Sequence, residues 1–279
     1  MDFVIGNKGY NSFICARSNE PVDVFWSDLD NNGRHDFFMS YTKNGNQYPM
    51  FSMDEMVISF PSFLSKKFTT YSAFSGKTMV EIFGQEHLKR GRLKANEFGH
   101  LLLINNGSNM TIKHLPFESQ ISPINGMIVM DINEDGFDDI IGVGNNQYTR
   151  VTHGPDDAHN GFVLINKNGK LQYSDGRQNG FYVPGDGKSI AVIPNKKDLS
   201  ILAFQNNEKA IAFNPSNKLS WQKAPKGAVK AEILLKNGTK RARYIGLGGG
   251  YWSANAPGVI KDKNIKQIIF FNKDGGIVN

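Results

Sequence analysis

Short apolar runs alternate with turns rich in glycine and asparagine along most of the chain. Runs of strand length that are rich in Val, Ile, Leu and Phe and bounded by such turns predict β-strands. Strands that recur at this spacing are typical of a barrel, a sandwich or a propeller, so we expect a mainly β fold. The clearest runs are residues 22–28, 35–41, 99–108, 125–131, 138–146, 161–170, 188–194, 199–205 and 209–215.

One region has a different period. Residues 61–91, "PSFLSKKFTTYSAFSGKTMVEIFGQEHLKRG", place apolar side chains three and four positions apart, which is the spacing of a helix. Gly76 separates two such stretches, and Gly91 follows the second. Because glycine commonly ends helices, we predict a helical hairpin inserted between strands.

Composition adds limits on the class of protein. The 279 residues include 29 glycines and 11 prolines, which fits many turns and short strands. Cys15 is the single cysteine, so no internal disulfide can form. The start of the chain lacks the basic and apolar regions of a signal peptide. No segment is apolar over a long enough stretch to span a membrane, so we predict no transmembrane segment.

Charge is distributed unevenly between the two ends of the chain. Residues 216–279 carry twelve Lys and Arg against three acids, although the whole chain has a net charge of only +6. A basic segment can indicate a nucleic-acid partner. Here the basic residues alternate with apolar ones, as on the solvent face of strands, and no nucleic-acid motif accompanies them. We therefore predict no nucleic-acid partner.

Two acidic loops carry the candidate chemistry. "DLDNNGRHD" (28–36) and "DINEDGFDD" (131–139) both place an acid or amide at positions 1, 3, 5 and 9 and glycine at position 6. Crowded carboxylates repel one another unless a cation lies between them, and oxygen ligands favour Ca²⁺ over zinc or copper. The candidate ligands, with position 7 offering only its main-chain carbonyl, are Asp28, Asp30, Asn32, Arg34 and Asp36 in the first loop and Asp131, Asn133, Asp135, Phe137 and Asp139 in the second.

The EF-hand is the nearest alternative for such loops. It needs a bidentate Glu at position 12 and helices on both sides. Position 12 is Met39 in one loop and Gly142 in the other, and both loops lead into apolar runs. The EF-hand therefore does not fit. Two aspartate-rich turns that bind no metal stay open as a further alternative.

The loops and their surroundings resemble a known family. "DLDNNGRHDFFMS" and "SPINGMIVMDINEDGFDDIIGVGN" resemble the FG-GAP/VCBS repeats of β-propellers, and "NGFYVPGDGKSIAVI" is similar to later parts of large bacterial VCBS-repeat proteins. "GAVKAEILLKNGTKRARYIGLGGGYWSANAPG" (227–258) resembles the ASPIC/UnbV domain that closes such proteins. The chain departs from that pattern near its end, where "FFNKDG" (270–275) stands in place of the usual "WPSG".

The resemblance implies an architecture. It implies a partial β-propeller at residues 1–215, with the helical insertion at about 61–91, and a small C-terminal β domain at 216–279. The residues left for blades correspond to about four, at roughly 40–50 residues per blade. Propellers of this family have more blades, so the chain is expected to be the C-terminal portion of a longer one, completed by further blades.

The resemblance also implies a function. Its members are exported and bind protein or glycan ligands outside the cell or at the outer-membrane surface, without an established catalytic centre. The expected protein is thus a calcium-stabilised binding or scaffold module and not an enzyme.

The alternative is a carbohydrate-active enzyme on a propeller scaffold, with a rim site in "HGPDDAH" (153–159). The groups available there are His153, Asp156, Asp157 and His159. They could also form a His/carboxylate metal site, or a solvated loop that contacts a ligand.

Overall fold

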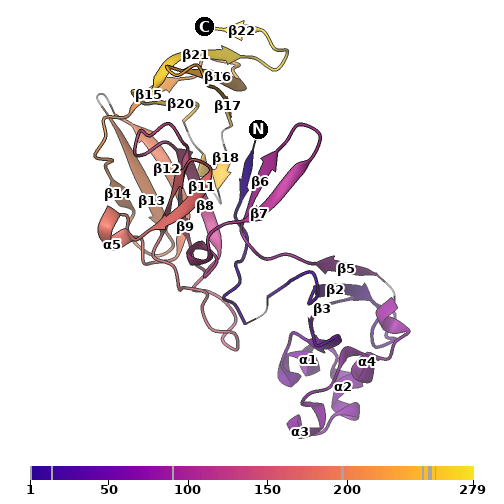
Figure 1. Cartoon of the computed structure of the whole chain (residues 1–279). Helices are drawn as coiled ribbons and strands as arrows, with labels where there is room; N and C mark the ends of the chain where they lie inside the picture. Colours follow the sequence, from indigo (N-terminus) through magenta and orange to yellow (C-terminus); the bar gives the residue numbers. More distant parts are fainter. Residues whose placement is uncertain are drawn as a thin grey trace. The chain divides into compact units, whose positions relative to one another are not determined.

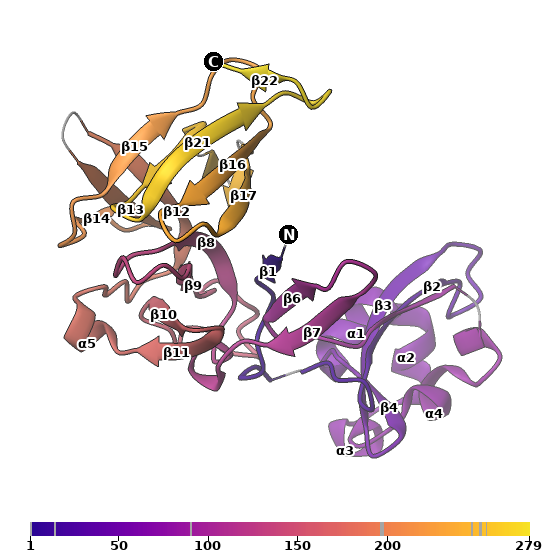
Figure 2. The same cartoon turned by 45° about the horizontal axis from the view of Figure 1, so that its top comes forward.

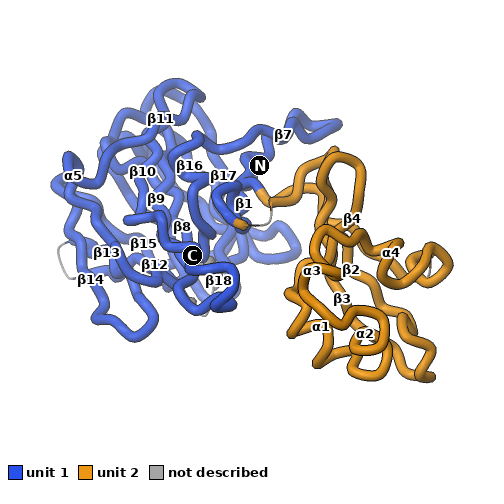
Figure 3. Tube along the Cα trace, turned by 90° about the horizontal axis from the view of Figure 1, so that it is seen from below, with its two compact units in different colours: residues 1–12, 99–279 blue, residues 13–98 orange. Residues whose placement is uncertain are grey.

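The computed structural model describes residues 2–13, 15–89, 91–195, 198–246, 248–250, 253–254 and 256–279. The fold is mainly β, with 41% strand and 12% helix, and its sheets are small and antiparallel (Figure 1). Each of the apolar runs expected from the sequence contains a strand, so that prediction is confirmed. The chain divides into two compact units, residues 1–12 with 99–279 (unit 1) and residues 13–98 (unit 2) (Figure 3).

Unit 1 begins with a three-stranded sheet in the order β1-β6-β7. One face of this sheet, which includes Val4 and Leu102, packs against Ile140, Phe162 and Leu164. The insertion of unit 2 separates β1 from its partner β6 in the sequence. The strands are β1 (Phe3–Ile5), β6 (Leu101–Asn105) and β7 (Met110–His114), followed by the 3-10 turn η2 (Phe117–Ser119).

The largest sheet of unit 1 has the order β11-β10-β9-β8-β18-β19, and it packs on the sheet β12-β13-β14. The core between them contains Ile128, Ile141, Val143, Ile190 and Ile201. The elements are β8 (Ile124–Met130), β9 (Asp139–Gly144), β10 (Phe162–Lys167), β11 (Lys170–Ser174), α5 (Gly176–Asn179), β12 (Gly187–Pro194), β13 (Leu199–Gln205), β14 (Ile211–Phe213), β18 (Gly248–Gly250) and β19 (Ser253–Ala254).

The C-terminal strands form a second core within unit 1. A four-stranded sheet has the order β17-β16-β21-β22 (Figure 2). A further pair of strands is formed by β15 and β20. Buried positions alternate along β16, where Ala231, Ile233 and Leu235 face the core, as expected from the sequence. The strands are β15 (Ser220–Lys223), β16 (Lys230–Leu235), β17 (Lys240–Tyr244), β20 (Gly258–Lys261), β21 (Ile265–Phe271) and β22 (Ile277–Val278).

Unit 2 has helices on one face of a sheet in the order β4-β3-β2-β5. Phe25 and Phe38 of the sheet pack with Met56, Leu64 and Ile82 of the helices. The elements are β2 (Val22–Ser27), β3 (Asp36–Lys43), β4 (Asn46–Pro49), α1 (Met53–Ser59), α2 (Pro61–Lys67), α3 (Tyr71–Phe74), α4 (Met79–Phe83), the 3-10 turn η1 (His87–Lys89) and β5 (Arg92–Ala95).

The helical region differs from the predicted hairpin. It starts at Met53, before the expected 61–91, and it consists of four short helices instead of two. The reason is capping: the side chains of Ser52, Thr70 and Thr78 each accept a bond from a backbone N–H two or three residues into a new helix. Gly76 lies between α3 and α4 with φ +72°, where a helix cannot continue.

The propeller stays a prediction. The described residues form several small sheets and show no closed barrel or propeller. The predicted boundary between 215 and 216 falls inside unit 1, where β18 of the C-terminal segment pairs with β8. Of the ASPIC-like stretch, Leu247, Tyr251, Trp252 and Asn255 lie outside the described residues.

Candidate calcium loops

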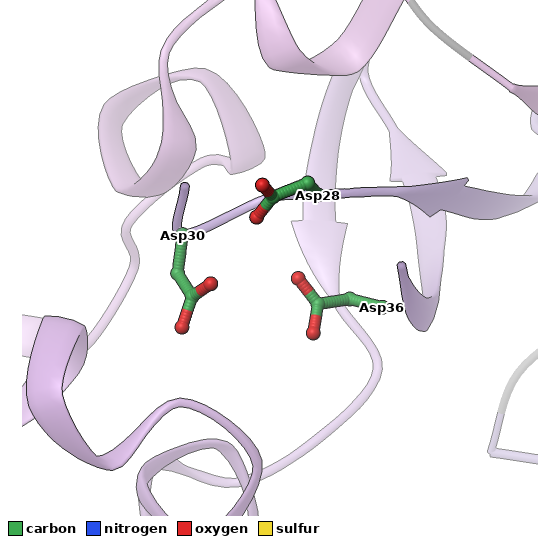
Figure 4. Close-up of side chains that lie close together, drawn as sticks. All are labelled: Asp28, Asp30 and Asp36. Atoms are coloured by element: carbon green, nitrogen blue, oxygen red, sulfur yellow. The ribbon is translucent and has the colours of Figure 1, made fainter. Parts of the chain in front are cut away.

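The first acidic loop joins β2 to β3 in unit 2. Ser27 and Asp36 are paired in register at its base, so the loop closes a hairpin. Asp28, Asp30 and Asp36 each offer a carboxylate oxygen, and these oxygens lie within 4.8 Å of one another. Figure 4 shows the three carboxylates turned toward a shared space. The hairpin thus gathers three of the five predicted ligands of this loop.

Backbone amides hold the carboxylates in place. Both oxygens of Asp28 accept bonds, from the N–H of Asn32 at 2.9 Å and the N–H of Gly33 at 2.9 Å. Asp36, at position 9, accepts from the N–H of Leu29 at 2.8 Å. The side chain at position 1 therefore accepts bonds from the backbone at positions 5 and 6, and the side chain at position 9 accepts one from the backbone at position 2.

The second loop, between β8 and β9 in unit 1, repeats these bonds. Asp131 accepts from the N–H of Asp135 at 3.1 Å and from the N–H of Gly136 at 2.8 Å. Asp139 accepts from the N–H of Ile132 at 3.0 Å. Position 7 is also equivalent, since the N–H groups of Arg34 and Phe137 donate to the side chains at position 5, at 2.9 and 2.8 Å. The two loops therefore share one local fold.

That fold requires two residues with positive φ. Asn31 and Glu134, at position 4, have φ +60° and +57°. Gly33 and Gly136, at position 6, have φ +84° and +92°. A Cβ added at either glycine would meet nothing within 4 Å. Backbone conformation, and not lack of space, is therefore the reason for glycine at position 6.

Burial and neighbouring charges both raise the pKa of the carboxylate at position 9 of each loop. Burial raises the pKa of Asp139 to about 6, and the neighbouring Asp135 and Asp131 contribute to the rise. Burial also raises the pKa of Asp36, as do the charges of Asp30 and Asp28. A bound cation would remove this repulsion and lower both pKa values.

The second loop is less open than the first. The side-chain amide of Asn133 donates to Asp135 at 2.9 Å, and Asp139 also accepts from the N–H of Asn166 at 2.8 Å. Within the described ranges, three His, Cys, Asp or Glu side chains converge in the first loop alone. An ion in the second loop would have to displace the Asn133–Asp135 contact.

The second loop also binds the C-terminal strands, which the sequence reading missed. Asp138 forms ion pairs with Arg241, at 3.2 Å, and with Arg243. Glu134 pairs with Lys263 at 2.9 Å. The sequence offered one indication of these ion pairs: the second loop has acids, Glu134 and Asp138, at positions 4 and 8, which supply no ligand to the proposed ion. The first loop has Asn31 and His35 there.

The stretch 153–159 does not form a site among the described residues. His159 is buried and Asp157 is exposed, while Asp156 pairs with Lys8 at 2.7 Å. His153, Asp156 and His159 do not bring three ligand atoms together. These side chains give no support to a metal site or an acid–base pair.

In comparisons with protein-family models, curated proteins and solved structures, the chain gave no match. Among the described helices, none has the length and hydropathy that a membrane span requires, in agreement with the sequence.

Proposed function

We propose that the protein is a calcium-stabilised binding module in which both acidic loops hold Ca²⁺. The observation that supports this is the shared set of backbone bonds in the two loops, which lie 103 residues apart in the sequence. Ordinary aspartate-rich turns would have no reason to repeat ligand types, glycine position and hydrogen bonds together. A common requirement for one cation accounts for all three.

The donor set fits calcium. Carboxylate, amide and carbonyl oxygens are the ligands of a hard cation, and Ca²⁺ accepts them at about 2.3–2.6 Å in flexible geometry. The residues that would hold the ion are those at positions 1, 3, 5, 7 and 9 of each loop. The role is structural, because each loop joins two paired strands, β2 with β3 and β8 with β9.

Calorimetry on protein stripped with a chelator tests this proposal. We expect two calcium sites in the full chain, one lost on Asp28→Ala and the other on Asp131→Ala. Asp157→Ala is the matched control, because it removes an exposed acid outside both loops. Absence of calcium binding to the folded wild-type chain would leave the loops as ordinary turns and end the proposal.

The setting of this module is proposed from the family resemblance. It is extracellular or at the outer-membrane surface, on FG-GAP/VCBS-type blades with an ASPIC/UnbV-like C-terminal segment, and it binds a protein or glycan. The packed antiparallel sheets of unit 1 are compatible with blades. A glycan array and a screen for polysaccharide turnover test the ligand and the expected lack of catalysis. Turnover that is lost on Asp157→Ala would favour the enzyme instead.

A further inference from the structure

Unit 1 contains a groove of about 730 Å³ that parts of three sheets line. Two walls are apolar and come from packed sheet faces. One consists of Val4, Leu102 and Ile104, and the other includes Val129, Ile140 and Leu171.

The third side of the groove is the edge of β17. All five residues of this strand, Lys240–Tyr244, line the groove. Consecutive side chains of a strand point to opposite faces, so a groove that touches all of them must run along the strand's edge.

The hydrogen-bond register shows which backbone groups face the groove. The N–H of Leu235 donates to Thr239 at 2.9 Å, and the N–H of Ile245 donates to Val229 at 2.9 Å. Bonded and non-bonded pairs alternate between antiparallel strands, so Arg241 and Arg243 direct their backbone groups to β16. The N–H and C=O groups of the residues between them, Lys240, Ala242 and Tyr244, therefore point toward the groove.

This edge has no neighbour in the part of the chain that the structure describes. β17 is the outer strand of its sheet and pairs with β16 alone. A strand edge with unpaired N–H and C=O groups is a template for an added strand. Such a strand would lie over the apolar walls and bury them.

The charges around the edge of β17 indicate which side chains the added strand would have. Lys240, Arg241 and Arg243 line the groove with the acids Asp2 and Asp138. Both arginines pair with the single carboxylate of Asp138, so the lining keeps a net positive charge, to which Lys240 contributes most directly. Lys113 stands opposite Leu102 in register, on the same face of its sheet, and adds a further positive charge. An occupant with carboxylates is therefore favoured.

We propose that this groove binds an extended acidic peptide segment of a partner protein, which adds as a strand to the edge of β17. The backbone of the segment pairs with Lys240, Ala242 and Tyr244. Its acidic side chains lie near the basic residues, and its apolar side chains contact the two walls. An acidic polysaccharide could satisfy the charges but offers no amide ladder to the strand edge.

The proposal rests on the binding function proposed above and gives its partner a chemical class. The proposed contacts with the peptide are made by β17 and the apolar walls and not by a calcium ion, because the groove shares only Phe137 and Asp138 with the second loop. A calcium titration of the same protein therefore separates the two: absence of calcium binding with intact peptide binding would contradict only the former proposal.

The first test uses a synthetic peptide of alternating glutamate and valine, labelled for fluorescence anisotropy, with the full chain. We expect saturable binding that weakens with salt, and none for the matched peptide of alternating lysine and valine. Two further peptides carry N-methyl groups on alternate amides, in one frame or the other. Only one edge of an added strand faces β17, so one frame should lose binding and the other should keep it.

Variants of the chain test the placement. Ala242→Pro removes an N–H that points away from β16, and proline is tolerated at such edge positions, so we expect about tenfold weaker binding in a folded protein. Lys240→Glu should also weaken binding. The control is Lys236→Glu, which should leave binding unchanged. Lys236 is an exposed lysine in the turn between β16 and β17, and it does not line the groove.

The outcomes are distinct. Loss of binding in one methylation frame, with weakening by Lys240→Glu and not by Lys236→Glu, supports the proposal even if Ala242→Pro fails to fold. No saturable peptide binding, or equal binding of both methylated peptides, overturns it. Binding of polygalacturonate that Lys240→Glu weakens, without peptide binding, would assign the groove to acidic glycans and also overturn it.

Discussion

At the scale of single residues, backbone conformation determines that glycine stands at position 6 of each acidic loop. Gly33 and Gly136 have positive φ in open space, so an alanine there meets strain and no clash. Asparagine tolerates this region better than alanine. The N–H of each glycine also donates to the carboxylate at position 1. The backbone conformation of the glycine therefore affects the orientation of a proposed calcium ligand.

We therefore predict that Gly33→Ala lowers both the stability of unit 2 and the calcium affinity of the first loop. The expected cost in stability is about 1–2 kcal/mol without calcium, measured by denaturant unfolding. Gly45→Ala is the matched control: Gly45 has φ +77° in open space in the turn between β3 and β4. It should lose similar stability with calcium affinity unchanged. Unaltered calcium binding by Gly33→Ala would contradict the link.

Two buried histidines should make the fold acid-sensitive. Burial lowers the pKa of both His100 and His159 to about 4, and His100 contributes to the lowering at His159. The ring nitrogens of His159 have no hydrogen-bond partner among the described residues. In the unfolded chain both rings take up protons below about pH 6.5, while the folded chain resists until about pH 4. The stability that the two neutral rings contribute is therefore full above pH 6.5 and is lost as pH falls toward 4.

His159→Phe tests this prediction. Each buried histidine should lower the free energy of unfolding of the wild type by on the order of 2–3 kcal/mol between pH 7 and pH 4.5. The raised pKa values of Asp36, Asp131 and Asp139 act in the opposite direction in both proteins, so the difference between wild type and variant is the quantity to measure. The variant should lose less over the same interval, whatever its stability at pH 7. The control is His35→Gln, which changes an exposed histidine. An equal change in stability of wild type and His159→Phe between these pH values would contradict it.

At the scale of elements, caps decide where the helices of unit 2 begin. Thr78 and Glu81 form a capping box at the start of α4, where each side chain binds the other residue's backbone N–H. Hydrogen bonds from the backbone and hydroxyl of Thr78 and from Lys77 hold the pKa of Glu81 at about 2. A four- or five-residue helix depends on such bonds, because it has few of its own.

Thr78→Ala should destabilise unit 2 by about 1 kcal/mol, since it removes the acceptor for the N–H of Glu81. Thermal unfolding followed by helical circular dichroism measures it. Thr69→Ala is the matched control, because Thr69 is an exposed threonine just before the cap of α3 and caps no helix. Equal effects of the two substitutions would show that the capping box does not stabilise α4.

At the scale of the whole molecule, the two calcium loops belong to different compact units. Residues 28–36 lie in unit 2 and residues 131–139 in unit 1. The described bonds of each loop stay within its own unit, including the contacts of the second loop with Arg241 and Lys263. The two proposed sites should therefore act on stability separately.

We expect the effects of Asp28→Ala and Asp131→Ala in calcium to be additive within about 0.5 kcal/mol. Calorimetric unfolding and amide hydrogen exchange of the single and double variants measure this. Asp28→Ala should loosen β2 and β3, while Asp131→Ala should loosen β8, β9 and the C-terminal strands. Exchange that increases in both hairpins on either substitution would show that the sites are coupled.

The sequence by itself determined the local structure. Alternation and turn residues predicted the strands, because the period of side chains along a strand is a property of adjacent residues. The spacing of acids and glycine predicted two loops of one kind, and their backbone bonds are local as well. The capping residues Ser52 and Thr78 could have predicted the short helices from the same local information.

Only the tertiary structure decided what depends on register between distant segments. It placed Asp138 against Arg241 and Arg243, buried His159 while leaving Asp157 exposed, and left the edge of β17 facing a groove. It also joined β1 to β6 across the insertion that forms unit 2. Each of these depends on which strands pair and in which register. A shift of one residue would turn every side chain of a strand to the other face, and no local pattern carries that choice between distant strands.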